Sequence, residues 1–547
     1  MINASVHLGF FPKQVFATVA LVFTIFLPWA EATASSVEQS LAAAITAREP
    51  DLKRGPGAIA ADDMRAVYAS RGFRPLWVDR DGLTAAGQAL EAVLDSAAED
   101  GLDPARYALL PAGLPGTPGG IAEAELDATL MLLRFAKDLA TGRPALRRQA
   151  PEHHIEAPTL DLPGVLAAAA AAPDVGAYLR SLAPPHPAYQ RLRAALAEHR
   201  ARAADGAAWP AFPDGPTLRR GDSDERVRLL RDVLARTGDG GPATMALQPA
   251  LFDGALEDAV TAFQERHGLT PDGVVGPKTR AALDVSLAAR IRQIEINMER
   301  WRWMPRDLGE PHVLVNMAGF ELSMVEGGDE VLGMRVVVGL PYRSTPVFSG
   351  KITYLEFNPY WNIPHSIATK DMLPRVQQDP SYFDAQGIRV FTGWGSEALE
   401  LDPWMIDWWA FSRGNFPFRL RQDPGPKNAL GRVKFMFPNR FAVYLHDTPS
   451  PELFRRAVRT FSSGCIRVEK PADLAHRLLA HNRGWSPERI AETMQGGPRR
   501  IVTLNRPVPV HLTYLTAWSS ADGTVHFRDD IYGRDAVLSN ALVARSG

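Results

Sequence analysis

The spacing of apolar residues changes near residue 310, and no other feature of this chain restricts its fold as strongly. Before that point apolar residues recur with a helical period, as at Leu126 and Leu130. After it the period is two, as at Val313 and Val315, which is typical of strands. Because helices and strands bury their apolar faces in different ways, we expect the two parts to fold as separate domains.

The chain of 547 residues is long enough for three or four structural units, at roughly 100–200 residues per domain. The changes of period and the Pro- and Gly-rich breakers predict a multidomain fold. Its expected parts are a signal peptide at 1–34, a helical scaffold domain at 35–210, a three-helix module at 217–285, a linker helix at 290–308, a mainly-β, sandwich-like or barrel-like domain at 310–505, and an extension at 506–547 with one or two strands.

The N-terminal segment has the pattern of an export signal. Lys13 precedes an apolar stretch at 15–27, and Ala32-Thr33-Ala34 matches an A-x-A cleavage site. The stretch is shorter than the ~20 residues that span a bilayer. Both a cleaved signal and a retained membrane anchor fit this pattern. Either way, the segment predicts a protein that acts outside the cytoplasmic membrane, in the periplasm.

The charge balance excludes some classes of partner. Lys+Arg total 60 and Asp+Glu total 62, which gives a formal charge of -2. Nucleic acid is therefore not an expected partner, and we expect membrane contact only through an uncleaved signal segment. The histidines do not cluster at metal-ligand spacing, so neither a metal site nor a cofactor is predicted.

Residues 217–285 carry a series of short motifs. We expect helices at about 224–236 and 255–267, and a third helix that begins at Pro277. The motifs are Arg220-Gly221-Asp222, Phe252-Asp253-Gly254, Phe263-Gln264, Gly268-Leu269 and the run 272–279. With them the segment resembles a peptidoglycan-binding module, which implies affinity for cell-wall glycan or stem peptide. The alternative is a helical spacer that has lost binding.

The strand pattern lapses between about 365 and 430, which predicts an insertion in the mainly-β domain. This insertion is rich in tryptophan: Trp394, Trp404, Trp408 and Trp409. On a helix, Trp404 and Trp408 would form one aromatic face, because they are four residues apart. We interpret the insertion either as a small local core or as a lid that closes over an extended substrate.

Cys465 is the only cysteine of the chain, which excludes an intrachain disulfide. In an exported protein a single thiol is either buried and inert or retained for its reactivity. Gly464 permits a backbone conformation that leaves its own N–H and that of Cys465 free for a substrate oxygen, as an oxyanion hole requires. Arg467 would share a face with Cys465 in an extended segment, and a nearby cation favours the thiolate.

His446 is the candidate general base. It is expected to end a strand, and Asp447 begins the turn that follows. A histidine within hydrogen-bond reach of a thiol can take its proton and later return it to a leaving amine. Two groups could orient the imidazole, the carboxylate of Asp447 or a backbone carbonyl, and the residues do not choose between them.

These residues resemble the motif of the L,D-transpeptidase catalytic domain, also called the YkuD domain. That family carries a histidine and then Ser/Thr-His-Gly-Cys, an apolar residue and Arg or Asn. Here the matching segments are His446 and Ser462-Ser463-Gly464-Cys465-Ile466-Arg467. Asp447 stands where many members have glycine, and Ser463 stands where many have a second histidine. The Ser-Ser-Gly-Cys variant, with the segments 73–78 and 101–104, is similar to the large multidomain branch of Gram-negative bacteria.

The resemblance implies a cysteine acyltransferase that forms 3→3 cross-links in peptidoglycan and is acylated by carbapenems. Cys465 would attack a donor tetrapeptide, D-alanine would leave with a proton from His446, and a neighbouring stem would resolve the thioester. The residues expected to support the reaction are Gly464, Ser463, Arg467 and Asp447. Those expected to bind substrate are Tyr444, Trp361, Tyr354 and Asn362.

The expected partners are peptidoglycan stem peptides and glycan, with other cell-wall synthesis enzymes as further candidates. The acceptor is either a stem diamino acid or a lipoprotein lysine. Two other functions fit the sequence. One is an L,D-carboxypeptidase, in which water replaces the acceptor amine at the same site. The other is a non-catalytic wall-binding protein, against which the intact His446 and Cys465 argue.

Overall fold

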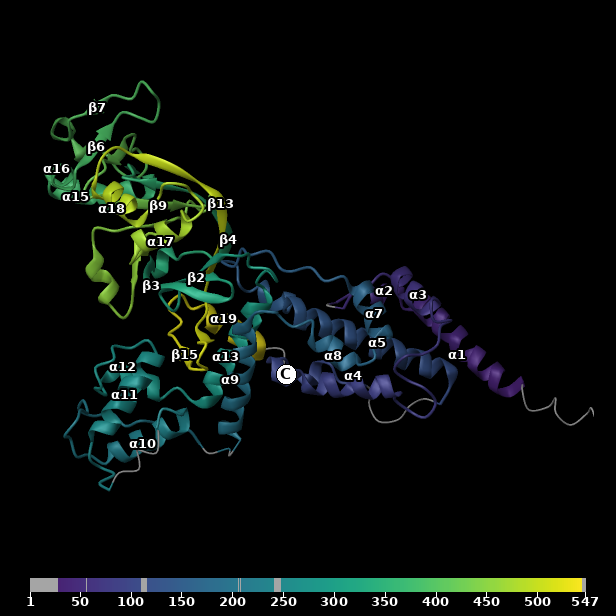
Figure 1. Cartoon of the computed structure of the whole chain (residues 1–547). Coiled ribbons are helices and arrows are strands. Elements are labelled where there is room, and N and C mark those ends of the chain that lie inside the picture. The colour runs from purple at the N-terminus through teal and green to yellow at the C-terminus, as the bar shows by residue number, and fades with distance from the viewer. Residues whose placement is uncertain are drawn as a thin grey trace, which may run out of the picture. The chain divides into compact units, whose positions relative to one another are not determined.

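The computed structural model describes residues 28–543, except 56, 110–115, 205, 207 and 241–246. Most of the expected signal peptide, at 1–27, lies outside the described residues. The chain divides into two compact units (Figure 1). One comprises Met1–Asp95, Ala105–Ala136 and Asp161–Arg180, and the other comprises Ser96–Pro104, Lys137–Leu160 and Ser181–Gly547. Among the described residues, no helix combines the length and the apolar character that crossing a membrane requires.

The first unit is helical, as expected for the scaffold region. Its helices are α1 (Pro28–Ala47), α2 (Glu49–Leu52), α3 (Ala61–Ala69), α4 (Ala85–Asp95), α7 (Leu162–Ala171), α8 (Val175–Arg180) and most of α5 (Pro118–Thr141). The periodic apolar residues of α5 are buried, including Leu126 and Leu133. Helical spacing in the sequence thus corresponds to the buried face of the longest helix in this unit.

A buried carboxylate fixes the segment before α4. Glu125 on α5 accepts hydrogen bonds from the N–H groups of Leu76, Trp77 and Val78, at 2.7, 2.8 and 3.1 Å. The hydroxyl of Tyr68 donates to the same carboxylate at 2.7 Å. Burial raises the pKa of Glu125, and these donors oppose that rise. One buried side chain therefore satisfies three consecutive backbone donors of the segment 76–78.

In the second unit, helices precede the strands along the chain. They are α6 (Pro144–Arg147), α9 (Pro187–Ala203) and α13 (Leu287–Arg302). The predicted linker helix at 290–308 is therefore shorter at its C-terminal end, because the helix stops at Arg302 and Trp303 lies in its C-cap. Arg302 is buried and pairs with Glu299 at 3.0 Å, which satisfies one charge inside the unit.

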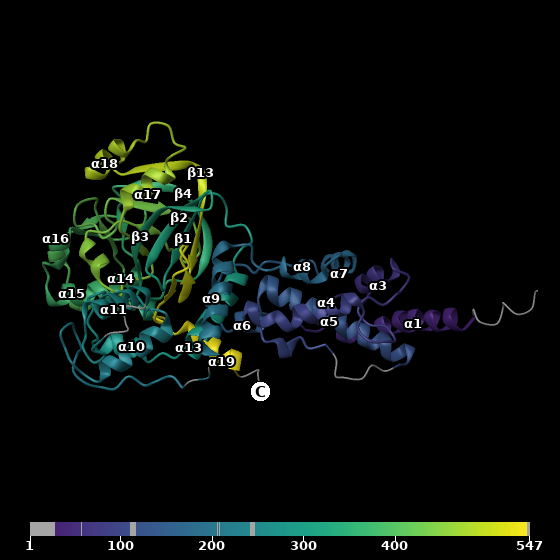
Figure 2. The same ribbon diagram turned by 60° about the horizontal axis from the view of Figure 1, so that its bottom comes forward.

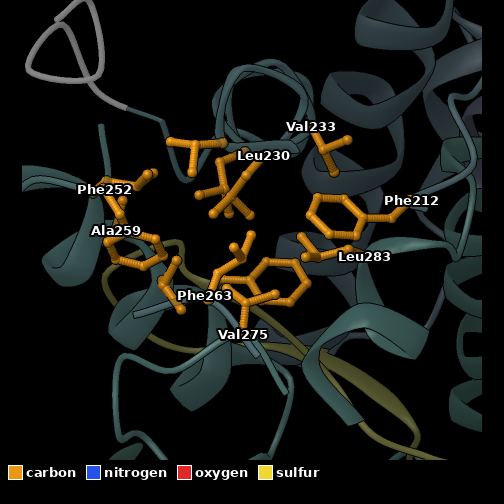
Figure 3. Packing of buried hydrophobic residues seen from close by; sticks show 13 residues of the cluster. Phe212, Leu230, Val233, Phe252, Ala259, Phe263, Val275 and Leu283 are labelled. Carbon is orange, nitrogen blue, oxygen red and sulfur yellow. The ribbon is translucent and has the colours of Figure 1, made fainter. Parts of the chain in front are cut away.

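Three helices form the module that follows residue 217. They are α10 (Arg226–Thr237), α11 (Gly254–Arg266) and α12 (Pro277–Leu283), near the positions expected from the sequence. Figure 3 shows the packing of the apolar side chains of this module, among them Leu230, Phe263 and Val275. The amide of Gln264 donates to the carbonyl of Val274 at 2.9 Å and accepts from the N–H of Gly273 at 2.8 Å. The Phe-Gln motif thus serves the fold of the module.

Nine of the described strands form one large sheet. They are β1 (His312–Asn316), β2 (Glu321–Glu326), β3 (Asp329–Gly339), β4 (Phe348–Phe357), β9 (Val433–Met436), β10 (Leu445–His446), β11 (Thr460–Ser462), β12 (Ile466–Val468) and β13 (Arg500–Thr513). Their order is β11-β3-β12-β10-β9-β4-β13-β1-β2, and β2 also pairs with β3. The sheet therefore closes on itself, which confirms the mainly-β, barrel-like prediction.

The long strands β4 and β13 run antiparallel and lie side by side (Figures 1 and 2). His446 ends a strand, as expected, but this strand is short, because only Leu445 and His446 join the sheet. The helices α17 (Pro471–Leu478) and α18 (Pro487–Gln495) follow β12. Strand β13 passes through the boundary expected at 505, and β14 (Ala517–Ser519), β15 (Val525–Phe527) and α19 (Arg534–Val543) come after it.

The insertion contains strands that the sequence did not indicate. A four-stranded sheet has the order β5-β8-β6-β7, formed by β5 (Trp361–Asn362), β6 (Ile388–Phe391), β7 (Glu400–Leu401) and β8 (Arg419–Gln422). Short helices accompany it: α14 (His365–Ile367), α15 (Leu373–Gln378) and α16 (Tyr382–Gln386). The insertion is thus a small subdomain with its own sheet and its own buried cluster.

The predicted helical face of tryptophans is wrong. Trp404 and Trp408 lie in two separate 3-10 turns, Pro403–Met405 and Trp408–Ala410. Trp408 is 4% exposed and belongs to the core of the insertion, whereas Trp404 and Trp409 are 58% and 73% exposed. Trp408 therefore stabilises the insertion, whereas Trp404, Trp409 and Trp394 lie at its surface.

Candidate active site

The strands β10 and β12 bring the expected nucleophile and base to one face of the sheet. They pair in parallel, with Leu445 opposite Ile466 and His446 opposite Arg467. One residue earlier, Tyr444 therefore lies opposite Cys465. Because alternate side chains of a strand point to the same face, Cys465 and His446 share a face on adjacent strands.

Two rows of side chains cross this face. The pairings of β10 with β9 and of β9 with β4 extend the row of Cys465 through Tyr444 and Met436 to Tyr354. The same pairings give a second row: Arg467, His446, Lys434 and Glu356. The site therefore consists of an aromatic and thiol row next to a row of charged and titratable groups.

His446 is buried, at 4% exposure, and its ring is held by the main chain. Its Nδ1 lies 2.5 Å from the carbonyl oxygen of Asp447. Since a carbonyl can only accept, Nδ1 carries the proton in this contact, and the backbone of Leu430 makes a further hydrogen bond with the ring. Burial lowers the pKa of His446 to about 3, and the charges of Arg467 and Lys434 add to this effect. The imidazole is therefore neutral at physiological pH.

The carboxylate of Asp447 has another task. It accepts hydrogen bonds from the N–H groups of Arg432 at 2.8 Å and Thr448 at 2.7 Å. Of the two groups that the sequence left open, the backbone carbonyl of Asp447 contacts the imidazole, and its carboxylate ties two loops together. Burial raises the pKa of this carboxyl, and the two N–H donors oppose the rise.

Cys465 is half-buried and immediately precedes β12. Its thiol donates to the carbonyl of Ala442 at 3.7 Å. Burial raises the pKa of Cys465, whereas hydrogen bonds from Tyr444 and the positive charges of Lys434 and Arg467 lower it. The cation expected at Arg467 therefore acts in the predicted direction, but burial outweighs it in the free protein.

The loop before Cys465 departs from the expected oxyanion hole. Gly464 has a φ of 120°, which favours glycine. Its N–H donates to the hydroxyl of Ser462 at 3.1 Å, so the prediction that this N–H is free is wrong. The carbonyl of Gly464 accepts from Thr345 at 2.8 Å. Among the described residues no hydrogen bond engages the N–H of Cys465, which leaves this donor for a substrate oxygen.

Ser463 contacts a residue that the sequence did not single out. The guanidinium of Arg343 donates to the Ser463 hydroxyl at 2.8 Å and to the carboxylate of Asp371 at 2.6 and 2.9 Å. Arg343 precedes β4, and Asp371 belongs to the insertion. The side chain at the position of the family's second histidine therefore takes part in a connection between the nucleophile loop and the insertion.

The expected substrate residues fall into two groups. Tyr444 and Tyr354 lie in the row of Cys465. Trp361 and Asn362 form β5, which pairs with β8 in the sheet of the insertion and lies outside the two rows. In the described part of the chain, no cluster of three or more histidine, cysteine or acidic side chains is arranged to hold a metal ion.

Sequence reasoning missed Lys434, Arg343 and Asn439. The side chain of Asn439 bonds the N–H groups of Phe441 and Val443 at 3.0 and 3.2 Å, which shapes the turn before β10. A turn signal at Asn439 was available in the sequence. No local signal marked Lys434 or Arg343, because their partners lie on strands and loops that are distant along the chain.

Comparison with known families divides the chain into three parts. Residues 62–196 match the scaffold domain, residues 223–283 match the putative peptidoglycan binding domain, and residues 310–509 match the YkuD family, the L,D-transpeptidase catalytic domain. The chain thus contains a scaffold domain, a peptidoglycan-binding domain and an L,D-transpeptidase catalytic domain.

A curated relative from Haemophilus influenzae, described as a putative L,D-transpeptidase, is 36% identical over 252 residues. The match covers 46% of this chain and 50% of that protein, so the chain spans about half the length of this relative. A solved L,D-transpeptidase from Xylanimonas cellulosilytica is 19% identical, with a TM-score of 0.18, over 55% of this chain and 100% of that one. One from Stackebrandtia nassauensis is 15% identical, with a TM-score of 0.22, over 56% and 97%.

Proposed function

We propose, from the premise that residues 310–509 are an L,D-transpeptidase catalytic domain, that this chain forms 3→3 cross-links in peptidoglycan through a thioester on Cys465. The observation that carries the proposal is the placement of Cys465 and His446 on one face of β12 and β10. His446 presents a neutral imidazole whose Nδ1 donates to a carbonyl, and in this proposal its Nε2 acts as the base.

In the first half of the reaction the thiol of Cys465 gives its proton to Nε2 of His446 as the sulfur attacks a donor tetrapeptide. The attacked carbonyl belongs to the diamino acid, and the N–H of Cys465 stabilises the oxyanion that forms. The C–N bond to the terminal D-alanine then breaks. The leaving amine takes the proton from His446, and a thioester remains.

In the second half the side-chain amine of an acceptor attacks the thioester. The amine gives a proton to His446 as the new amide forms, and the released sulfur takes that proton back. The acceptor we propose is the diamino acid of a neighbouring stem, which gives a 3→3 dimer. Attack by water would instead release a tripeptide, as an L,D-carboxypeptidase does, and a lipoprotein lysine would give a protein-bound peptide.

The domains that accompany this site support a protein of the cell wall. A peptidoglycan-binding domain and a scaffold domain are present in the same chain, which indicates an extracytoplasmic protein. We place it in the periplasm. Other cell-wall synthesis enzymes are proposed partners. We also propose that carbapenems reach this site and acylate it.

The test is muropeptide analysis with purified protein and tetrapeptide-containing muropeptides, with and without acceptor stems. The proposal predicts 3→3 dimers and free D-alanine from the native protein and neither product from a folded Cys465→Ala variant. Tripeptide alone, at every acceptor concentration, would identify a carboxypeptidase. Intact-mass measurement after incubation with a carbapenem separates these enzymes from a wall-binding protein, because only a reactive Cys465 forms the adduct.

A further inference from the structure

Lys434 is a buried cation beside the nucleophile, and no motif of the chain accounts for it. Its side chain is 13% exposed, and its Nζ lies 4.4 Å from the centre of the Tyr444 ring. That ring belongs to the residue opposite Cys465, whose sulfur accepts hydrogen bonds from Tyr444. A cation over an aromatic face is attracted by the ring and restrains its position.

The charge of Lys434 is only partly compensated. Its partner Glu356 lies 3.8 Å away, and the same carboxylate makes a closer contact of 2.5 Å with Arg499. The other charged or titratable groups of the two rows are Arg467, which is positive, His446, which burial keeps neutral, and the phenols Tyr444 and Tyr354. Burial lowers the pKa of Lys434, whereas the charges of Glu356 and of an ionised Cys465 raise it.

We propose that Lys434 is a positioning residue that holds the Tyr444 ring against Cys465 and stabilises the thiolate through its charge. The chemical reason lies in the neutrality of His446, because an imidazole without charge cannot stabilise an anion on the sulfur of the free enzyme. Lys434 and Arg467 are then the positive groups next to that sulfur. The importance of this effect for turnover rests on the proposed function, but the effect on the thiol does not.

The single cysteine makes the effect directly measurable. Alkylation of the full chain by iodoacetamide, followed by intact mass, reports the thiolate of Cys465 alone. Lys434→Met removes the charge and keeps most of the side-chain volume. We expect the midpoint of the pH–rate profile to rise by about one unit, so that alkylation at pH 7 slows about tenfold. Lys434→Arg should restore most of the rate.

The matched control is Lys351→Met, which removes an exposed lysine from β4 and should leave the profile unchanged. Glu356→Gln removes a negative charge from the same site and therefore tests the opposite effect on the thiol. It removes the negative group that competes for Lys434, so the midpoint should fall and alkylation at pH 7 should become faster. This variant keeps the test valid if Lys434→Met does not fold.

A folded Lys434→Met protein with a native profile would overturn the proposal, and so would an unchanged or raised midpoint in Glu356→Gln. A purely structural role would lower thermal stability in Lys434→Met and Lys434→Arg alike without a shift of the midpoint. If the native protein makes no cross-links but the midpoints move as expected, the proposed function fails and the role of Lys434 stands. If cross-links form and the midpoints do not move, the proposed function stands and the role of Lys434 fails.

Discussion

The imidazole Nδ1 of His446 and the main-chain carbonyl oxygen of Asp447 lie 2.5 Å apart. The base is thus oriented by the peptide unit that follows it. A peptide carbonyl is present whatever side chain occupies position 447. The contact that orients His446 therefore does not depend on the side chain at position 447.

Replacing Asp447 by asparagine should therefore change activity little. The amide oxygen still accepts from one of the N–H groups of Arg432 and Thr448, and the carbonyl that holds His446 is unchanged. We expect kcat/KM within roughly threefold of the native value, which corresponds to less than ~1 kcal/mol. His446→Gln, measured in the same cross-linking assay, should lose about a thousandfold. Equal losses in both variants would contradict this assignment.

The buried neutral histidine also predicts an acid sensitivity. The pKa of His446 is about 3 in the folded protein and 6.5 when unperturbed, so the unfolded chain binds the extra proton below pH 6.5. Its contribution to stability is complete above pH 6.5 and is lost as the pH falls towards 3. At pH 5 the loss is about 2 kcal/mol.

Urea unfolding at pH 7 and pH 5 measures this effect. The drop in stability between the two pH values should be smaller in His446→Gln than in the native chain. His481→Gln, which alters an exposed histidine, should keep the native drop. The interpretation fails if both variants show the same acid dependence.

The contact between Arg343 and Asp371 should control how firmly the insertion sits at the nucleophile loop. Arg343→Met removes a two-pronged ion pair and the bond to Ser463, so we expect faster proteolysis within 365–378 and about a tenfold lower kcat/KM. Asp371→Asn should have a similar effect, and the double variant should add little. Arg343→Lys keeps the positive charge but cannot make two parallel hydrogen bonds to the carboxylate, so we expect an intermediate result. Fully additive effects would show that the two residues act separately.

In the first unit, Glu125→Gln should destabilise the fold. The amide NH₂ would face at least one of the backbone donors at 76–78 and leave it without an acceptor. We expect a loss of about 2 kcal/mol in the free energy of unfolding of that unit, visible as a lower midpoint in thermal unfolding. Glu123→Gln is the matched control on the same helix, because that side chain is 54% exposed and makes a surface ion pair.

Much of the fold could be predicted from the sequence, because the patterns that indicate its helices and strands lie within short stretches of the chain. The helical period of α5, the motifs of the three-helix module and the alternation in β1 each occur within a short stretch of chain. The four-stranded sheet of the insertion was missed because β5 and β7 have two residues each, too few to establish an alternating period. The helical spacing of Trp404 and Trp408 misled for a related reason, since one pair four residues apart also fits two separate turns.

The sequence predicted the site residues that belong to a short motif. It did not predict those that the pairing of distant strands brings to the site. Cys465 and His446 stand in one short segment with a recognisable pattern. Lys434 and Glu356 reach them only through the registers of β9 and β4, which no local spacing encodes. The N–H of Gly464 was misjudged because the glycine conformation is visible in sequence, whereas its capture by Ser462 depends on the shape of the loop.

The tail after β13 has a consequence for the order in which this protein can fold. Thr345, which binds the carbonyl of Gly464, has its own carbonyl bound by Arg534 at 3.0 Å, and Tyr532 donates to Gly339 at 2.7 Å. Arg534 is 189 positions beyond Thr345 in the chain. The loop that carries the nucleophile therefore cannot complete its supporting hydrogen bonds until residues 532–534 have folded back against it, so the order of the site depends on a segment that is distant along the chain.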